Sequence, residues 1–226
     1  MSWINIILAT MVALLPIANP FSTSAVFLGI TPDNTERERR AQALRACIYM
    51  FAILLAFLIA GTLIMDFFGI SIPGLRIAGG LMIALIALGM LRPADDHDED
   101  EDAAKAARKK PDVSFTPLAM PSLSGPGAIA VTIGLATEAE SWMDFGAIII
   151  GLAVVSLICF IVLAASTKVV KFLGVNGMNA MTRIMGFLLL CVGIQFIVNG
   201  IIGIVVEETF LENLMRMYHQ AAANIE

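Results

Sequence analysis

The stretch "LLPIANPFSTSAVFLG", Leu14 to Gly29, interrupts the first long apolar segment of the chain. It places Pro16, Pro20 and a run of hydroxyl side chains where a membrane-spanning helix would have aliphatic ones. Proline lacks a backbone N–H and clashes with the preceding turn, which costs about 3 kcal/mol in a helix interior. As one helix, Trp3–Ile30 would be ~42 Å long, whereas the hydrocarbon core of a bilayer is ~30 Å thick. We therefore expect this span to kink or to break into two half-helices near Pro16–Pro20.

The composition of the whole chain indicates a membrane protein. The 226 residues are 58% hydrophobic and 15% charged, with a mean hydropathy of +0.86. Soluble domains carry about 25% charged residues, and an apolar run of roughly 18 residues is enough for a spanning helix. No basic region precedes the first segment, so we expect no cleaved signal peptide. The expected fold class is an all-α polytopic membrane protein.

Six apolar segments can be drawn, and they fall into two groups of three. The first group occupies residues 1–91 and the second residues 117–206, with a charged linker at 92–116 and a tail at 207–226. The expected spans are Trp3–Ile30, Cys47–Phe68, Leu75–Leu91, Pro117–Thr137, Phe145–Thr167 and Ile184–Val206.

Basic residues predict the orientation of these spans. Twelve of the 14 Lys and Arg residues lie in the first, third and fifth connections, and the two exceptions are Arg76 and Arg216. Basic loops stay on the cytoplasmic side of a membrane. We therefore predict that these three connections are cytoplasmic and that both termini are extracytoplasmic.

Three short motifs recur in the same order in both groups of spans, which indicates an internal duplication. Because each copy has three spans, the second copy enters the membrane from the opposite side. Such 3+3 inverted repeats are used by many secondary transporters, whose sites lie between the halves near the midplane. The matched motifs are "PIANP" (Pro16–Pro20) with "PLAMP" (Pro117–Pro121), "FGI" (Phe68–Ile70) with "LGV" (Leu173–Val175), and "RIAGGL" (Arg76–Leu81) with "RIMGFL" (Arg183–Leu188).

The fourth span repeats the interruption of the first as "PLAMPSLSGPGAIAVTIG", from Pro117 to Gly134. Prolines and glycines make a continuous helix from Pro117 to Gly127 unfavourable, and irregular backbone at membrane depth requires protein or a watery cavity beside it. The N-terminus of a half-helix suits a carboxylate, whereas unwound carbonyls suit an ammonium group. The expected breaks are at Pro16, Pro20, Pro117, Pro121 and Pro126, and the candidate solute-binding residues are Asn19, Ser22, Thr23, Ser24, Ser122, Ser124, Gly125 and Gly127.

Two of these interpretations have alternatives. The interrupted spans can be plain kinked helices whose hydroxyls bond back to their own backbone. Arg76 and Arg183 occupy equivalent positions in the two copies, and they are either buried functional charges or side chains that reach to the interface.

The sequence predicts neither an enzyme nor a metalloprotein. No catalytic signature is present, and both histidines lie in a loop or the tail. The run Asp95, Asp96, His97 and Asp98 is interpreted as part of a solvated linker rather than as a metal site. We expect no metal and no cofactor.

Glycines recur at a spacing of seven residues in the last span, at Gly186, Gly193 and Gly200. This spacing gives one smooth helix face and predicts close packing against another helix. We interpret Gln195 and Asn199 on the same span as residues that bond a neighbouring helix rather than line a cavity.

Four stretches resemble the MarC family of bacterial inner-membrane proteins. They are "LLPIANPFSTSAVFLGI", "FGISIPGLRIAGGL", "PLAMPSLSGPGAIA" and "RIMGFLLLCVGIQFIVNGI", and the resemblance extends from Trp3 to about Val205. It implies a six-span protein of the cytoplasmic membrane, with members described as transporters of small neutral amino acids such as glycine and alanine.

The sequence thus predicts a secondary transporter of small solutes that works by alternating access. Neutral amino acids such as alanine or glycine are the candidate solutes. The alternatives are a non-transporting membrane scaffold and an oligomeric channel. The expected partners are the lipid bilayer, a small solute and, as an open option, further copies of the chain, but no nucleic acid.

Overall fold

Helices make up the described part of the chain, which is residues 2–92, 110 and 112–206 of the computed structural model, and no strand occurs within it. The predicted all-α class is therefore confirmed. Five helical segments are long and apolar enough to cross a membrane, where α1 and α2 count together as the segment Trp3–Ile30. There are six if the bent pair η2 and α6 also forms one span. The helices are α1 (Trp3–Ala18), α2 (Pro20–Ile30), α3 (Glu36–Phe68), α4 (Ile72–Leu91), η2 (Ser114–Leu123), α6 (Pro126–Glu138), α7 (Trp142–Ala164) and α8 (Ser166–Val206).

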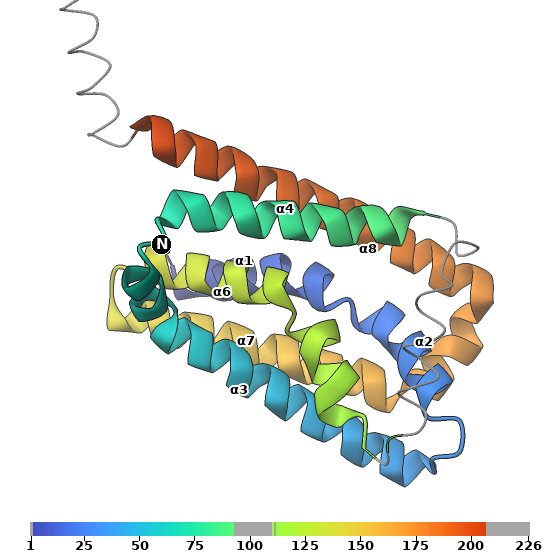
Figure 1. Ribbon diagram of the computed structural model, residues 1–226. Coiled ribbons are helices and arrows are strands. Elements are labelled where there is room, and N and C mark those ends of the chain that lie inside the picture. Colours follow the sequence, from blue (N-terminus) through green and yellow to red (C-terminus); the bar gives the residue numbers. More distant parts are fainter. Residues whose placement is uncertain (1, 93–109, 111, 207–226) are drawn as a thin grey trace, which may run out of the picture.

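The helices other than α2 and η2 lie in three layers (Figure 1). Helices α4 and α8 form one outer layer, α3 and α7 form the other, and α1 and α6 lie between them. Helix α1 contacts α7, and α6 contacts both α3 and α4. The middle layer therefore consists of helices that belong to the interrupted segments.

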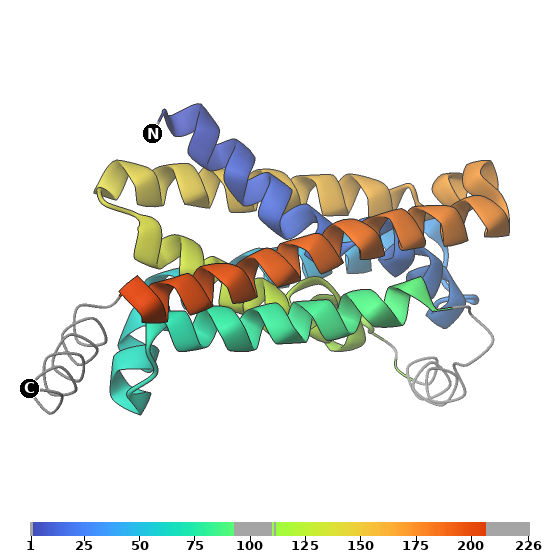
Figure 2. The ribbon, with the colours of Figure 1, turned by 90° about the horizontal axis from the view of Figure 1, so that it is seen from above.

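Glycines allow α4 and α8 to lie side by side along their lengths (Figure 2). A Cβ atom added at Gly80 would lie 2.6 Å from the carbonyl oxygen of Gly193, and one added at Gly200 would lie 2.8 Å from the carbonyl oxygen of Pro73. A Cβ at Gly186 would lie 2.9 Å from the Cβ of Met90. Small residues let helix backbones approach closely in membranes. The close packing predicted from the glycine spacing is confirmed.

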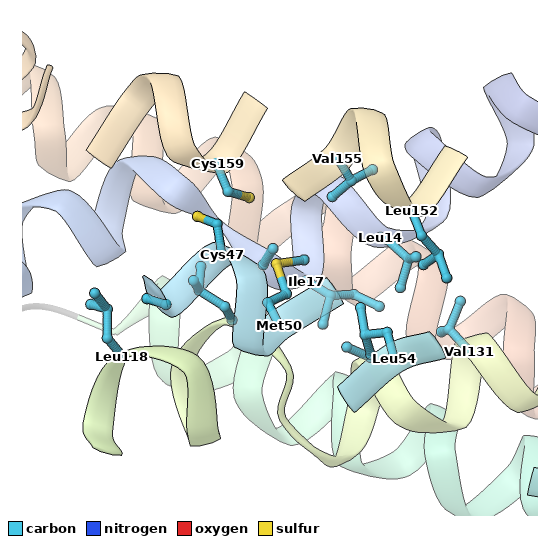
Figure 3. Close-up of a cluster of buried hydrophobic side chains, with 14 of the residues drawn as sticks. Leu14, Ile17, Cys47, Met50, Leu54, Leu118, Val131, Leu152, Val155 and Cys159 are labelled. Atoms are coloured by element: carbon cyan, nitrogen blue, oxygen red, sulfur yellow. The ribbon is translucent and has the colours of Figure 1, made fainter. Parts of the chain in front are cut away.

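The core lies where the middle layer meets α3 and α7 (Figure 3). Leu14 of α1, Leu54 of α3 and Leu152 of α7 are completely buried there. Lipid tails are as apolar as these side chains, so the core is stabilised mainly by close packing rather than by transfer from water.

The interruptions of the first and fourth predicted spans occur at residues that precede proline. Asn19 precedes Pro20 and adopts the left-handed region at φ 34° and ψ 66°. Thr116 and Met120 precede Pro117 and Pro121 and are extended, with φ near −125°. The proline ring disfavours helical backbone in the residue before it. The chain therefore leaves the helix one residue before the proline.

Pro16 does not break a helix, contrary to expectation. It lies inside α1, which continues to Ala18. The hydrogen bond from the N–H of Asn19 to the carbonyl of Leu15, at 3.0 Å, keeps the turn after Pro16 closed. A missing proline N–H removes only one bond of the ladder, and the neighbouring bonds carry the helix past it.

Two predicted connections are helical instead. Helix α3 begins at Glu36 because Thr35 caps it: the Thr35 hydroxyl accepts from the N–H of Glu38, and the Glu38 carboxylate accepts from the N–H of Thr35 at 2.8 Å. The predicted connection Lys168–Arg183 lies within α8, which is interrupted at Gly174, where φ is +64°.

The described parts of the basic connections share one end of the molecule. The α2–α3 connection, the ends of α4 and α7 and the beginning of η2 lie there, whereas the N-terminus, the α3–α4 turn and the α6–α7 turn lie at the other end (Figure 1). We call these the basic end and the N-terminal end. Their assignment to the cytoplasmic and extracytoplasmic sides stays a prediction. Residues 93–109 and 207–226, with the acidic run Asp95–Asp98 and Arg216, lie outside the described residues.

Candidate functional site

The first interruption buries an asparagine between two half-helices. Asn19 is 5% exposed, and its Oδ1 accepts a hydrogen bond from the N–H of Ser22 at 3.4 Å, which caps α2. Asparagine tolerates the left-handed region and is among the best N-cap residues. With Pro20 as the first residue of α2, the local sequence specifies both the end of α1 and the start of α2.

A chain of hydrogen bonds leads from this asparagine to α8. The Nδ2 group of Asn19 donates to Ser22 Oγ at 2.7 Å, and Ser22 Oγ lies 2.6 Å from Thr182 Oγ1. The Thr182 hydroxyl donates to the carbonyl oxygen of Met178 at 2.9 Å. Each hydroxyl has one proton, so Ser22 donates to Thr182. The donors in this series of hydrogen bonds therefore all point in one direction, and the series joins the first interruption to the last helix.

The other two hydroxyls of the first interruption bond to nearby backbone. Thr23 Oγ1 donates to the carbonyl of Ala18 at 3.3 Å, and Ser24 Oγ donates to the carbonyl of Pro20 at 2.7 Å. Both side chains are buried. In this conformation their protons are used within the interruption itself.

The second interruption is longer and its hydroxyls also bond to backbone. Helices η2 and α6 are bent by 60°. Ser122 Oγ donates to the carbonyl of Pro117 at 2.9 Å, and Ser124 Oγ donates to the carbonyl of Ala119 at 2.8 Å. In a regular helix the N–H of Pro121 would bond to the Pro117 carbonyl, but proline has none. The Ser122 hydroxyl takes the place of that missing donor.

Glycine allows the second interruption to pack closely against α4, beside the end of α1. A Cβ added at Gly127 would lie 2.8 Å from Ile83 Cγ1 and 3.8 Å from Ile17 Cγ2. Ile17 is two residues before Asn19, so the start of α6 packs beside the end of α1. A Cβ at Gly125 would lie 2.6 Å from the carbonyl oxygen of Pro121.

The predicted residues thus fall into two groups. Among the described residues no hydrogen bond joins Asn19 or Ser22 to Ser122 or Ser124. The two interruptions meet through backbone and aliphatic side chains. Their polar side chains are not brought into one cluster in this conformation.

A cavity of about 130 Å³ lies between α1, α4, α6 and α8 near the N-terminal end. Arg76 and Glu138 line it, and their Nη2 and Oε1 atoms form an ion pair at 2.6 Å. A second cavity of about 230 Å³, between α1, α6 and α7, shares Glu138. The Arg76 side chain is 21% exposed and Glu138 is 60% exposed, so the pair lies at the mouth of the bundle.

The predicted equivalence of Arg76 and Arg183 does not extend to their surroundings. Arg183 is exposed on α8, and the two ion pairs within the described part of the chain involve Arg45 and Arg76. Arg76 is therefore the one of the two that lines a cavity.

Thr182 and Met90 contribute to the site but are not apparent from the sequence. Met90 Sδ lies 3.9 Å from Asn19 Nδ2. The interpretation of Gln195 and Asn199 is wrong, because Gln195 Nε2 donates to Asn199 Oδ1 on the same helix at 2.8 Å and Asn199 lines the smaller cavity. Within the described ranges, no cluster of three potential metal-ligating side chains occurs.

This arrangement defines an integral membrane protein of the polytopic helical class, with polar side chains gathered at interrupted helices. A family model described as "MarC family integral membrane protein" matches residues 4–205, and the chain belongs to the MarC family. The resemblance found in the sequence is confirmed.

Proteins with the name "UPF0056 inner membrane protein MarC" are similar to the chain over most of its length. The protein of Citrobacter koseri is 42% identical over 206 residues, which cover 86% of this chain and 93% of the relative. Those of two Escherichia coli strains, SMS-3-5 and K12, are 43% and 42% identical with the same coverage. Comparison with solved structures gave no significant match.

Proposed function

We propose that the protein is a secondary transporter that moves a small neutral solute by alternating access, without covalent chemistry. Small amino acids such as alanine and glycine are the first candidates. The proposed location is the inner membrane, as the names of the relatives state for them. The basic end would face the cytoplasm.

The arrangement of layers supports an inverted repeat of residues 1–91 and 117–206. In such a repeat α3 corresponds to α7 and α4 corresponds to α8, and each of these pairs forms one layer. If the two copies are equivalent, the contact of α2 with α8 corresponds to the contact of α6 with α4. Both contacts are present. Transporters with inverted repeats bind solute where the halves meet.

The hydrogen-bonded chain from Asn19 to Thr182 is the observation that carries the proposal. It places an amide and two hydroxyls between an interrupted helix of one copy and the last helix of the other. Polar groups at such an interface can exchange partners when the halves move, because a solute can replace either member of a pair. A purely structural kink needs no bond to another copy.

The cavity beside Arg76 supports access from one side. It is lined by Ala13 of α1, which is six residues, or ~9 Å, before Asn19 along the helix. In the proposed cycle this cavity leads a solute from the N-terminal end toward Asn19. The contact of Ser22 with Thr182 closes the path toward the basic end and opens in the alternative state.

The chemistry of the interruption favours a solute without net charge. The amide and hydroxyls of Asn19, Ser22 and Thr182 are neutral donors and acceptors. The N-terminus of α2 adds a partial positive charge that suits a carboxylate, and the unwound backbone offers carbonyl oxygens to an ammonium group. A zwitterion has both a carboxylate for the N-terminus of α2 and an ammonium group for the carbonyl oxygens, and it carries no net charge.

Uptake by purified protein in liposomes tests the proposal. We expect saturable uptake of labelled alanine or glycine, little uptake of leucine or glutamate, and none in protein-free liposomes. Uptake that does not saturate would indicate a channel. Absence of uptake for every small neutral solute, with folded protein in the vesicles, would contradict the transporter and favour a scaffold.

A further inference from the structure

A wide groove at the basic end lies outside the proposed solute path. Its volume is about 820 Å³, and it lies between the first turns of α3, the end of α7 and the start of α8. Four cationic side chains and one carboxylate line it. These are Arg37, Arg39, Arg40 and Lys168, with Glu36.

The positive charge of the groove is not neutralised by ion pairs within the described residues, where the two pairs involve Arg45 and Arg76. Arg39 is held in place by neutral groups. Its Nη2 donates to the carbonyl of Asn34 at 2.8 Å and its Nη1 donates to Thr167 Oγ1 at 3.2 Å. One guanidinium is thus positioned at the groove without an ion-pair partner among the described residues.

An apolar groove continues from the cationic one along the same two helices. Its volume is about 240 Å³, and Phe160 lines both grooves. Leu44 and Ile48 of α3 and Leu157 of α7 line the apolar part and are about half exposed. In a bilayer, exposed apolar side chains on this face of α3 and α7 would contact lipid tails.

We propose that the two grooves together bind one anionic phospholipid of the leaflet at the basic end. The phosphate would lie among Arg37, Arg39, Arg40 and Lys168, and one acyl chain would lie between α3 and α7 past Phe160. Basic pockets between membrane helices suit anionic headgroups, whereas an apolar groove open to lipid suits a tail. A soluble anion would leave the apolar groove unfilled, and a lipid without net charge would leave the positive charge of the cationic groove unpaired. This proposal does not depend on transport.

Quenching of a single tryptophan tests lipid binding directly. The variant Trp3→Phe/Trp142→Phe/Phe160→Trp, in phosphatidylcholine vesicles, is titrated with phosphatidylglycerol brominated in its acyl chains and, separately, with brominated phosphatidylcholine. We expect half-maximal quenching at a roughly tenfold lower mole fraction of the anionic lipid. Equal quenching by both lipids would overturn the proposal.

Two pairs of matched variants separate a site from general surface charge. Arg37→Gln/Arg40→Gln/Lys168→Gln leaves only Arg39 in the groove and should strongly reduce the preference. Arg92→Gln/Lys110→Gln/Lys171→Gln removes equal charge from the same end outside the groove and should retain the preference. Likewise Ala153→Phe, in the apolar groove, should reduce quenching, and Ala56→Phe, exposed on α3 outside it, should not. Equal loss in both members of a pair, or displacement of the lipid by soluble glycerol phosphate, would overturn the proposal.

Discussion

The two interrupted spans have matching sequences but are held in place differently. The first is held in its middle, where Asn19 donates to Ser22 and Ser22 in turn bonds to Thr182 of α8. The second is held near its ends, by the ion pair of Arg45 with Asp112 before η2 and that of Arg76 with Glu138 at the end of α6. Its own hydroxyls bond to local backbone. The first interruption therefore supplies side-chain chemistry to the interface, and the second supplies close backbone packing.

The largest effect is expected at the packed glycine of the second interruption. Gly125→Ala places a Cβ 2.6 Å from the carbonyl oxygen of Pro121, so the backbone must shift. We expect a loss of about 1–3 kcal/mol in the free energy of unfolding. The measurement is thermal unfolding in detergent. Gly146→Ala is the matched control, because a Cβ there meets no atom within 4 Å; equal stability of the two variants would contradict the packing role.

At Asn19 the backbone and the side chain can be tested separately. Asn19→Ala removes the cap and puts alanine in the left-handed region, and we expect a loss of about 1–2 kcal/mol. Asn19→Gly removes the same side chain but adopts a positive φ readily, so its stability should be closer to wild type. Thermal unfolding of both variants is the measurement. If Asn19→Gly is as unstable as Asn19→Ala, the loss of the side-chain hydrogen bonds, rather than backbone strain, accounts for the lost stability.

The hydroxyls of the two interruptions should differ in coupling. Ser22→Ala and Thr182→Val cut one shared bond, so their effects on stability should not add, with a coupling of about 0.6 kcal/mol as is typical within membranes. Ser124→Ala should show no coupling with Thr182→Val. A coupling energy between Ser124 and Thr182 as large as that between Ser22 and Thr182 would contradict the proposed difference between the two interruptions.

The ion pair at the mouth of the cavity should matter less for stability. Because Glu138 is 60% exposed, Arg76→Gln should cost about 0–1 kcal/mol. In the transport proposal it should also alter solute uptake, since Arg76 lines the cavity. Arg183→Gln, on the exposed face of α8, is the control and should leave uptake at the wild-type level.

The smallest effect is expected at Asp112 and should depend on pH. Burial raises the pKa of this carboxyl, but hydrogen bonds with Ser114 and Arg45 outweigh burial and hold the pKa below its ordinary value. A lowered pKa stabilises the folded state above the unfolded pKa of about 3.9, and this contribution is lost as the pH falls through the folded value. Asp112→Asn should therefore lower the melting temperature slightly at pH 7. The difference from wild type should shrink in acid, and a difference that grows there would contradict this sign.

The helical class and the positions of the interruptions follow from local chemistry in the sequence. The backbone leaves the helix at Asn19 because a proline follows, and this constraint is visible in the sequence. The start of α3 was not predicted, although Thr35 and Glu38 have the spacing of a capping box that would have indicated it. Pro16 shows the limit of predicting helix ends from local sequence, because one lost hydrogen bond does not decide whether a helix ends.

The partner of Ser22 could not be predicted. Thr182 is 160 positions away along the chain, on a segment interpreted as a connection. Its contact depends on how α2 packs against α8, which local propensities do not specify. In the same way the sequence suggested equivalent arginines, but only tertiary packing places Arg76 beside Glu138 and leaves Arg183 exposed.

Transport through the interface at Asn19 is the central claim, and uptake by the Asn19→Gly variant in liposomes tests it most directly. The exposed residue Thr62 on α3 provides the control variant Thr62→Val. For the alanine or glycine that the wild type accumulates, we predict at least roughly tenfold lower uptake by Asn19→Gly, the factor that corresponds to about 1.4 kcal/mol of lost interaction. The control should transport like the wild type. Wild-type uptake by folded Asn19→Gly would contradict the proposed site.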